Sequence, residues 1–219
     1  MVEKPWEKEG WVTMMDEEHE IHGVTPDMID WWWDNMEKGH KLWNPIEHHA
    51  FRWEEGKAPS EVGHIGAVPI EYHGAHHTGE MIGTWLDVSA FPFPINYEHC
   101  LVLGGSSPDN KNQFLSVHMY SVADYGTKHR FLLIAKGAKA EAVRELRKAD
   151  KGANQPTQGD HTFATVEAER WPEFLPELYK LWSVVKDSEC NPQCDLRIKK
   201  MPNGRYAYVT PQNKSGVNK

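Results

Sequence analysis

The clearest pattern of apolar and polar positions is a helical one over "TPDMIDWWWDNMEKG", residues 25–39. Thr25 can cap this helix, and Pro26 suits its first turn. Gly39 can terminate it. An apolar stripe at helical spacing then faces the core, and it consists of Met28, Ile29, Trp32, Trp33 and Met36.

Trp31 lies to the side of that stripe, so two of the three consecutive tryptophans have a packing explanation and one does not. Two interpretations of Trp31 stay open. It walls an aromatic pocket, or it makes a second core contact.

The pattern between Val62 and Ala135 is strand-like. In "EMIGTWLDV" alternate residues from Ile82 to Val88 share one face, which we expect to point inward. "NQFLSVHMYSV" and "KHRFLLIAK" read as two strands joined by the turn "ADYGT". Residues 1–24 show no usable pattern and are expected to be irregular, and residues 54–61 form a polar loop.

Helical patterns return after these strands. "AEAVRELRKA" predicts one helix, and residues 160–187 predict another despite Pro172 and Pro176. A strand pair is expected around Pro202-Asn203-Gly204, followed by a polar tail. Helix, antiparallel strands and helices in this order predict an α+β fold.

Composition narrows the function. The 219 residues carry a formal net charge of -8, which argues against a nucleic-acid-binding protein. No apolar run is long enough to span a membrane, and the charged start lacks the apolar stretch of a signal peptide. Three cysteines make a poor disulfide framework and favour spare thiols in a reduced cytosol, hence a cytoplasmic protein: Cys100, Cys190 and Cys194.

Histidine is the unusual residue type, because twelve of thirteen histidines lie between His19 and His129. No nucleophile elbow and no phosphate-binding loop accompanies them. His48 and His49 point apart in any regular structure, so at most one of them is expected to bind a metal. The segment "EYHGAHHTGE" is either a metal-ligating segment or a solvated loop that precedes a strand, and it supplies His73, His76, His77 and Glu80.

Two carboxylates stand out because each falls on an apolar face. Glu80 shares the parity of Ile82, and Glu167 shares the helical stripe of Trp171. Unpaired burial of a carboxylate is costly, so each needs a salt bridge or a metal; together they favour a shared metal. His118 alternates with Tyr120 on a strand and is expected in the core or a pocket. His129 is expected to be exposed.

The chain resembles the diacetylphloroglucinol hydrolase and phloretin hydrolase family, which cleaves a carbon–carbon bond beside an aryl ketone. The resemblance runs from about Val24 to Trp182, through "GVTPDMIDWWWDNM", "KLWNPIEHHAFRW", "GEMIG", "HRFLLIAKG" and "FLPELYKLW". It implies a helix-grip (START/Bet v 1-like) fold, in which a curved antiparallel sheet wraps a long C-terminal helix around a deep cavity. The implied organisation is an N-terminal extension over 1–24, a catalytic domain over 25–187 and a C-terminal extension over 188–219.

The resemblance also implies one zinc or other divalent ion held by two histidines and two glutamates. His48, Glu80 and Glu167 match three of these ligands, whereas Phe163 stands where the second histidine is expected. His161 is the nearby substitute.

His40 replaces a tyrosine that the family places near the substrate. His118 or His40 is implied as the general acid. Substrate contacts are assigned to Trp31, Phe163 and Tyr120.

The implied reaction is hydrolysis of a carbon–carbon bond next to a ketone in an acylated phenol or a related small molecule. Two alternatives stay open, a lyase on the same scaffold and a non-catalytic protein that binds a hydrophobic ligand. The expected partner is a small aromatic or ketonic molecule, with no nucleic acid and no membrane; a homodimer is one alternative for the assembly.

Overall fold

The computed structural model describes residues 4–60, 63–74, 79–106, 111–149, 163–185, 197–200 and 206–209. The chain divides into two compact units, Met1–Pro176 and Glu177–Lys219. Among the described helices, none combines the length and the apolar character needed to cross a membrane.

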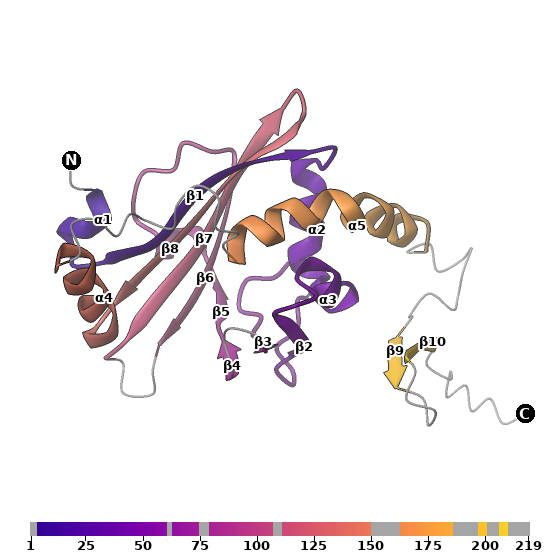
Figure 1. Cartoon of the computed structure of the whole chain (residues 1–219). Coiled ribbons are helices and arrows are strands. Elements are labelled where there is room, and N and C mark those ends of the chain that lie inside the picture. The colour runs from indigo at the N-terminus through magenta and orange to yellow at the C-terminus, as the bar shows by residue number, and fades with distance from the viewer. Residues whose placement is uncertain are drawn as a thin grey trace, which may run out of the picture. The chain divides into compact units, whose positions relative to one another are not determined.

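A five-stranded antiparallel sheet forms the centre of the first unit, with the order β1-β8-β7-β6-β5 (Figure 1). Its strands are β1 (Val12–His22), β5 (Thr84–Leu86), β6 (His99–Ser106), β7 (Gln113–Ala123) and β8 (Gly126–Lys136). The predicted hairpin is confirmed by β7 and β8. Gly126 allows its turn, because its φ is 139° and a Cβ there would lie 2.4 Å from the Ile21 carbonyl oxygen.

The strand β1 corrects the prediction that residues 1–24 are irregular. Its residues pair with β8 from Val12↔Ala135 to His22↔Gly126. The short helix α1 (Pro5–Lys8) precedes it. The segment is therefore an integral part of the sheet, and its pairing partners lie more than 100 residues away in the sequence.

A second, three-stranded antiparallel sheet has the order β2-β3-β4, and its strands are β2 (His48–Trp53), β3 (Pro69–His73) and β4 (Gly79–Ile82). The prediction of one strand from Glu80 to Val88 is wrong. β4 ends at Ile82, and β5 joins the large sheet after Gly83. Ile82 is 50 % exposed and Val88 44 %, whereas Trp85 is buried, so the inward face has the opposite parity.

The predicted helix begins as expected and ends early. α2 spans Pro26–Asp34, and the Met28 amide donates to the Thr25 side chain. Asn35, not Gly39, caps its end. Within the described residues, the other helices are the 3-10 turns η1 (Met36–Lys38) and η2 (Val88–Ala90), and α3 (His40–Trp43), α4 (Ala138–Ala149) and α5 (Phe163–Val185).

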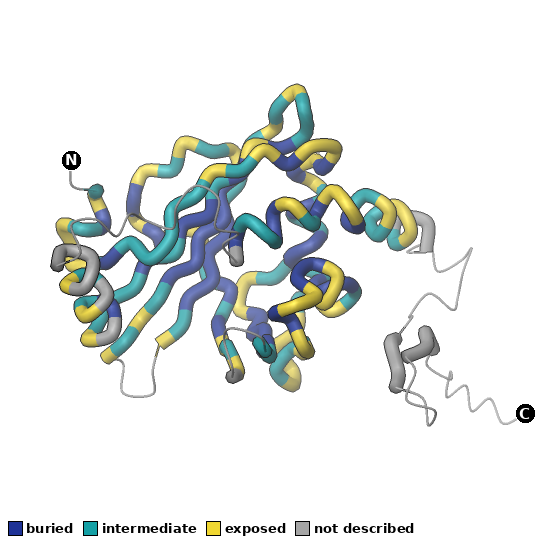
Figure 2. Tube along the Cα trace, viewed as in Figure 1, coloured by how far each residue is buried: buried dark blue, intermediate teal, exposed yellow. Residues whose placement is uncertain are grey.

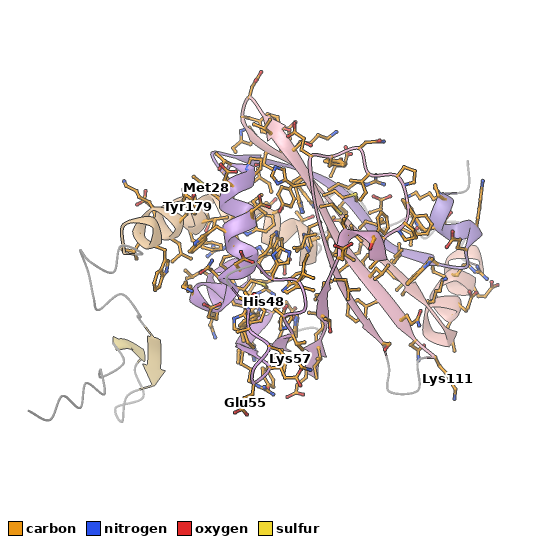
Figure 3. The ribbon with its side chains drawn as sticks, turned by 180° about the vertical axis from the view of Figure 1, so that it is seen from behind. Met28, His48, Glu55, Lys57, Lys111 and Tyr179 are labelled. Atoms are coloured by element: carbon orange, nitrogen blue, oxygen red, sulfur yellow. The ribbon has the colours of Figure 1, made fainter. Side chains whose placement is uncertain are left out.

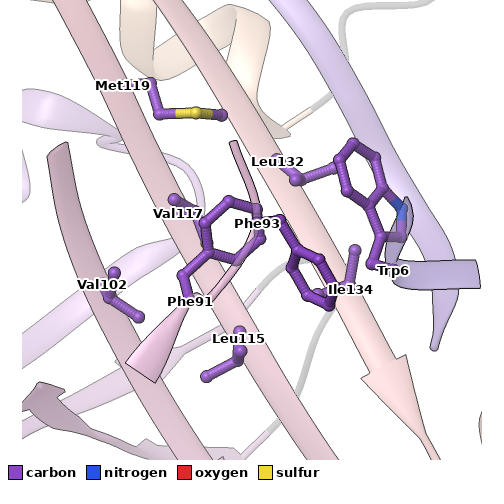
Figure 4. Packing of buried hydrophobic residues seen from close by; sticks show 9 residues of the cluster. All are labelled: Trp6, Phe91, Phe93, Val102, Leu115, Val117, Met119, Leu132 and Ile134. Atoms are coloured by element: carbon purple, nitrogen blue, oxygen red, sulfur yellow. The ribbon is translucent and has the colours of Figure 1, made fainter. Parts of the chain in front are cut away.

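The large sheet has two packed faces. On one, side chains from α1 and the segment after η2 cover the strands, with Trp6, Phe91 and Phe93 against Val117 and Leu132 (Figure 4). The other face carries His118 and Phe131 and meets α2 and the first half of α5. Figure 2 shows buried residues along the middle of the strands and α2.

The predicted C-terminal helix and the predicted strand pair are also confirmed. α5 is continuous despite Pro172 and Pro176. In the second unit, β9 (Arg197–Lys200) and β10 (Tyr206–Val209) form the predicted antiparallel pair, and residues 202–204 of the predicted turn lie outside the described residues. The fold is α+β, with an antiparallel sheet packed against a long C-terminal helix, as the helix-grip prediction requires.

Candidate functional site

A tight turn after α3 brings one of two adjacent histidines into the interior. Asn44 accepts a hydrogen bond from the Glu47 amide through its side chain (3.1 Å), and its carbonyl accepts one from the His48 amide (2.8 Å). The turn aims His48 inward, where it is fully buried, and leaves His49 exposed. Figure 3 shows His48 in the densely packed region near the end of α2.

Strand β3 adds two further polar groups to the same place. His48 and His73 are Cα partners across β2 and β3, and Glu71 lies two residues before His73, on the same side of the strand. Glu80 pairs with Tyr72 and therefore has the opposite parity to Glu71. Glu71 is buried and Glu80 exposed, so the structure brings Glu71 rather than Glu80 into the cluster.

The helix α5 supplies Glu167, which is buried in the first unit. Its Oε1 lies 3.1 Å from His48 Nε2. This contact agrees with the helical stripe from which an inward Glu167 was predicted. It joins one strand of the small sheet to the helix that crosses the large one.

Hydrogen bonds fix the protonation of the histidine rings. His48 Nδ1 lies 3.0 Å from the His40 carbonyl oxygen, so Nδ1 carries the proton and Nε2 presents its lone pair toward Glu167. His40 Nε2 (3.1 Å) and His73 Nε2 (3.3 Å) both donate to Glu71 Oε2. The rings of His40 and His48 stack with centroids 3.9 Å apart.

The pKa values of the two buried carboxyl groups are shifted in opposite directions. Burial alone would raise the pKa of Glu71, but the hydrogen bonds from His40 and His73 lower it well below its usual range. Burial, together with the charge of Glu71, raises the pKa of Glu167 well above its usual range. His48 has its pKa lowered by burial. The surroundings thus favour the charged form of Glu71 and the neutral form of Glu167.

A divalent cation fits this group of residues. Ligand atoms of His40, His48 and Glu71 lie within 4.8 Å of one another, and all three residues are buried. Among the described residues, Glu71 and Glu167 contact histidines and no lysine or arginine. Glu167 Oε1 is buried and lies 3.1 Å from His48 Nε2, but among the described residues it has no partner with hydrogen-bond geometry. Imidazole nitrogens and carboxylate oxygens are ligands that zinc prefers.

This cluster opens on a cavity of about 440 Å³ in the first unit. Glu71, His73 and Glu167 stand at its wall, with Glu80 also lining it. Most of the wall is apolar or aromatic. The remaining lining residues come from β1, α2, η1, α3, β4, β5, β6, β7 and β8, and they are Met14, Met15, Trp33, Met36, Trp43, Met81, Trp85, Leu103, Phe114, Ser116, His118, Phe131, Leu133 and Ala135.

A second polar pair lies at the cavity wall on the large sheet. His118 Nδ1 lies 3.1 Å from His129 Nε2, and Trp33 packs over the His118 ring with centroids 4.5 Å apart. Burial lowers the pKa of His118 to about 3. His129 is 2 % exposed, so the prediction of an exposed His129 is wrong. Its alternation with Phe131 on β8 was the sequence signal for an inward position.

The residues that were predicted to contact the substrate lie in different surroundings. Trp31 is half-buried and is not a lining residue, whereas its neighbour Trp33 is. Tyr120 donates to Asp30 instead of reaching the cavity wall. Phe163 is the first residue of α5. His76, His77, His161, Cys190 and Cys194 lie outside the described residues.

Comparisons with known proteins give only distant similarities. No protein-family model and no curated protein sequence matches the chain. Norcoclaurine synthase from Thalictrum flavum, a point mutant with a transition state analogue, is 12 % identical with a TM-score of 0.47, covering 78 % of this chain and 98 % of that one. Protein NE0264 from Nitrosomonas europaea is 12 % identical (TM-score 0.43; 77 % and 96 % covered). The protein Ara h 8.0201 is 13 % identical with a TM-score of 0.42, and the match covers 77 % of this chain and 99 % of that one.

Proposed function

We propose that this protein is a metal-dependent hydrolase that cleaves the carbon–carbon bond beside the ketone of an acylated phenol or a similar small molecule. One observation carries the proposal. The buried His40, His48 and Glu71 cluster, with Glu167 against it, opens on a cavity whose wall is mostly apolar. Such a cavity suits an aromatic ring, and the polar cluster at one end suits its acyl group.

His48, Glu71 and Glu167 are the proposed ligands. Ligand atoms of His48 and Glu71 lie within 4.8 Å of each other, and Glu167 Oε1 lies 3.1 Å from His48 Nε2. A divalent ion bound there would polarise a carbonyl and activate water. His73 is the histidine proposed to take the place left by Phe163, because it lines the cavity and already bonds Glu71.

The other residues bind and orient the substrate. Water attacks the acyl carbon, and the bond from this carbon to the ring carbon breaks. The ring carbon takes up a proton. The products are a carboxylic acid and a deacylated ring. His118 stands on the cavity wall and is the residue proposed to act at the ring of the substrate. His40 is not proposed for this role because it bonds Glu71. Trp33 is proposed to take the role of aromatic wall that was first assigned to Trp31.

Elemental analysis of the protein purified without added metal tests the site directly. We expect close to one divalent ion per chain, and loss of that ion in His48→Ala. The metal-loaded protein is then incubated with a panel of acylphloroglucinols and related aryl ketones. Release of a carboxylic acid and a deacylated ring is expected; full metal occupancy in His48→Ala, or no acid from any ketone, contradicts the proposal.

A non-catalytic role in binding a hydrophobic ligand is the second candidate, and the apolar wall of the cavity favours it. It predicts ligand binding that is equally strong with and without metal. A lyase would instead split the ketone without adding water, so that no carboxylic acid appears among the products. The same panel therefore separates the three functions.

A further inference from the structure

His118 and His129 form a pair of neutral imidazoles inside the first unit. The two residues are 5 % and 2 % exposed. Burial lowers the pKa of both rings, to about 3 for His118 and well below its usual value for His129. Each ring therefore carries one proton at neutral pH, and in the 3.1 Å contact between them one nitrogen donates and the other accepts.

The surroundings of His129 decide the direction of that hydrogen bond. Its Nδ1 is buried and has no hydrogen-bond partner among the described residues. If His118 donated, the proton of His129 would sit on Nδ1 as a buried N–H without an acceptor. If His129 donates through Nε2, only a lone pair is left unused. Orphaned buried N–H groups are rarer than under-used acceptors, so the second arrangement is favoured.

Neighbouring rings hold His129 in this orientation. The His19 ring stacks on it with centroids 5.8 Å apart, and Trp171 stands against it at an interplanar angle of 87° and 5.3 Å. His19 and His129 are also Cα partners across β1 and β8. The ring of His129 is thus fixed from two sides, while His118 faces the cavity.

We propose that His129 is a positioning residue that holds His118 as the tautomer protonated on Nε2, so that His118 presents an N–H donor to the cavity. The matching ligand carries an oxygen acceptor at this point, such as a ketone carbonyl or a phenolate, which rests on the aryl ketone proposed above as substrate. His118 acts on the ligand, and His129 acts through His118.

Nitrogen-15 NMR of the histidine rings in the metal-free protein tests the tautomer. We expect one His118 tautomer, with the proton on Nε2 and Nδ1 as an unprotonated acceptor. His129→Phe should abolish this single state and give a mixture, while His129→Gln keeps an N–H donor and should restore it. His19→Phe is the matched control, because His19 bonds neither nitrogen of His118. A His118 protonated on Nδ1, or a tautomer unchanged in His129→Phe, overturns the proposal.

Acetophenone and ethylbenzene test the ligand class, because they share a shape and differ in the carbonyl oxygen. Acetophenone is expected to shift the His118 Nε2 proton resonance, and ethylbenzene is expected to bind without that shift. Equal shifts from both would refute the donor role. Since no metal is present, a missing metal site would disprove the proposed hydrolase and leave this result intact.

Discussion

The choice between Glu71 and Glu80 as metal ligand can be tested with one pair of matched variants, Glu71→Gln and Glu80→Gln. Both residues line the cavity, both changes remove one negative charge, and both keep the size of the side chain. Glu71 is 4 % exposed and accepts from His40 and His73, whereas Glu80 is exposed. The two variants should therefore differ in stability and in zinc binding.

The expected loss of stability without metal follows from the two hydrogen bonds of Glu71. A bond to a charged group contributes about 1.5–3 kcal/mol and a neutral one about 0.5–1.5 kcal/mol. Neutralising the acceptor of two such bonds costs about 2 kcal/mol in Glu71→Gln, or roughly 4–8 °C in melting temperature for a unit of this size. Glu80→Gln should stay within about 0.5 kcal/mol.

Zinc binding is read from the same melting curves. At a free zinc concentration of 100 times the dissociation constant, bound metal stabilises the native protein by about 2.7 kcal/mol. If Glu71→Gln weakens binding about 100-fold, that increment falls to about 0.4 kcal/mol at the same zinc concentration. Glu80→Gln should keep the full increment. The reverse result, with zinc stabilisation lost in Glu80→Gln and kept in Glu71→Gln, would refute the ligand assignment made from the structure.

Three further changes test other parts of the molecule. Trp33→Leu should cost about 3 kcal/mol of unfolding free energy and Trp31→Leu under about 1 kcal/mol, measured by denaturant melts. Burial alone would raise the pKa of Asp16, but the hydrogen bond from Arg130 lowers this pKa below its ordinary value of 3.8. The charged Asp16 therefore stabilises the native protein fully above pH 3.8, and this stabilisation is lost as the pH falls through the lower native pKa. Asp16→Asn should therefore cost about 1.5–3 kcal/mol at pH 7 and nothing in strong acid. Phe163→His adds a further imidazole besides His73, one helical turn before Glu167, and should tighten zinc binding in calorimetry. A loss of about 1–3 kcal/mol of stability without tighter binding would place residue 163 outside the metal shell.

The elements that sequence predicts well are those with local signals. The start of α2 is marked by Thr25 and Pro26, and the β7–β8 hairpin by Gly126, so both were predictable from a few adjacent residues. β1 carries no such signal because its segment is acidic and only partly buried. Asp16, for example, is stabilised by Arg130, a partner 114 positions away.

The candidate site shows the same limit at the level of single residues. Glu167 was predictable from its helical stripe, because the signal lies within one element. Glu71 was not chosen, since its burial depends on hydrogen bonds from His40 and His73, and His40 is 31 positions away. The error in the parity of β4 and β5 has a related cause. At Gly83 the chain leaves the small sheet and enters the large one. A single alternation of inward and outward residues therefore does not continue from β4 into β5.

A cluster of tryptophans connects the two polar ends of the cavity, and one of the three consecutive tryptophans, Trp33, belongs to it. Trp33 contacts the ring of His118 and the ring of Trp43, and Trp43 in turn contacts His48. Trp171 packs against both Trp33 and Trp43. These buried rings pack between the histidine pair on the large sheet and the carboxylate cluster on the small one. In such a low-dielectric setting each hydrogen bond and each charge acts more strongly than it would in water. The aromatic cluster is therefore part of the proposed site as much as part of the core.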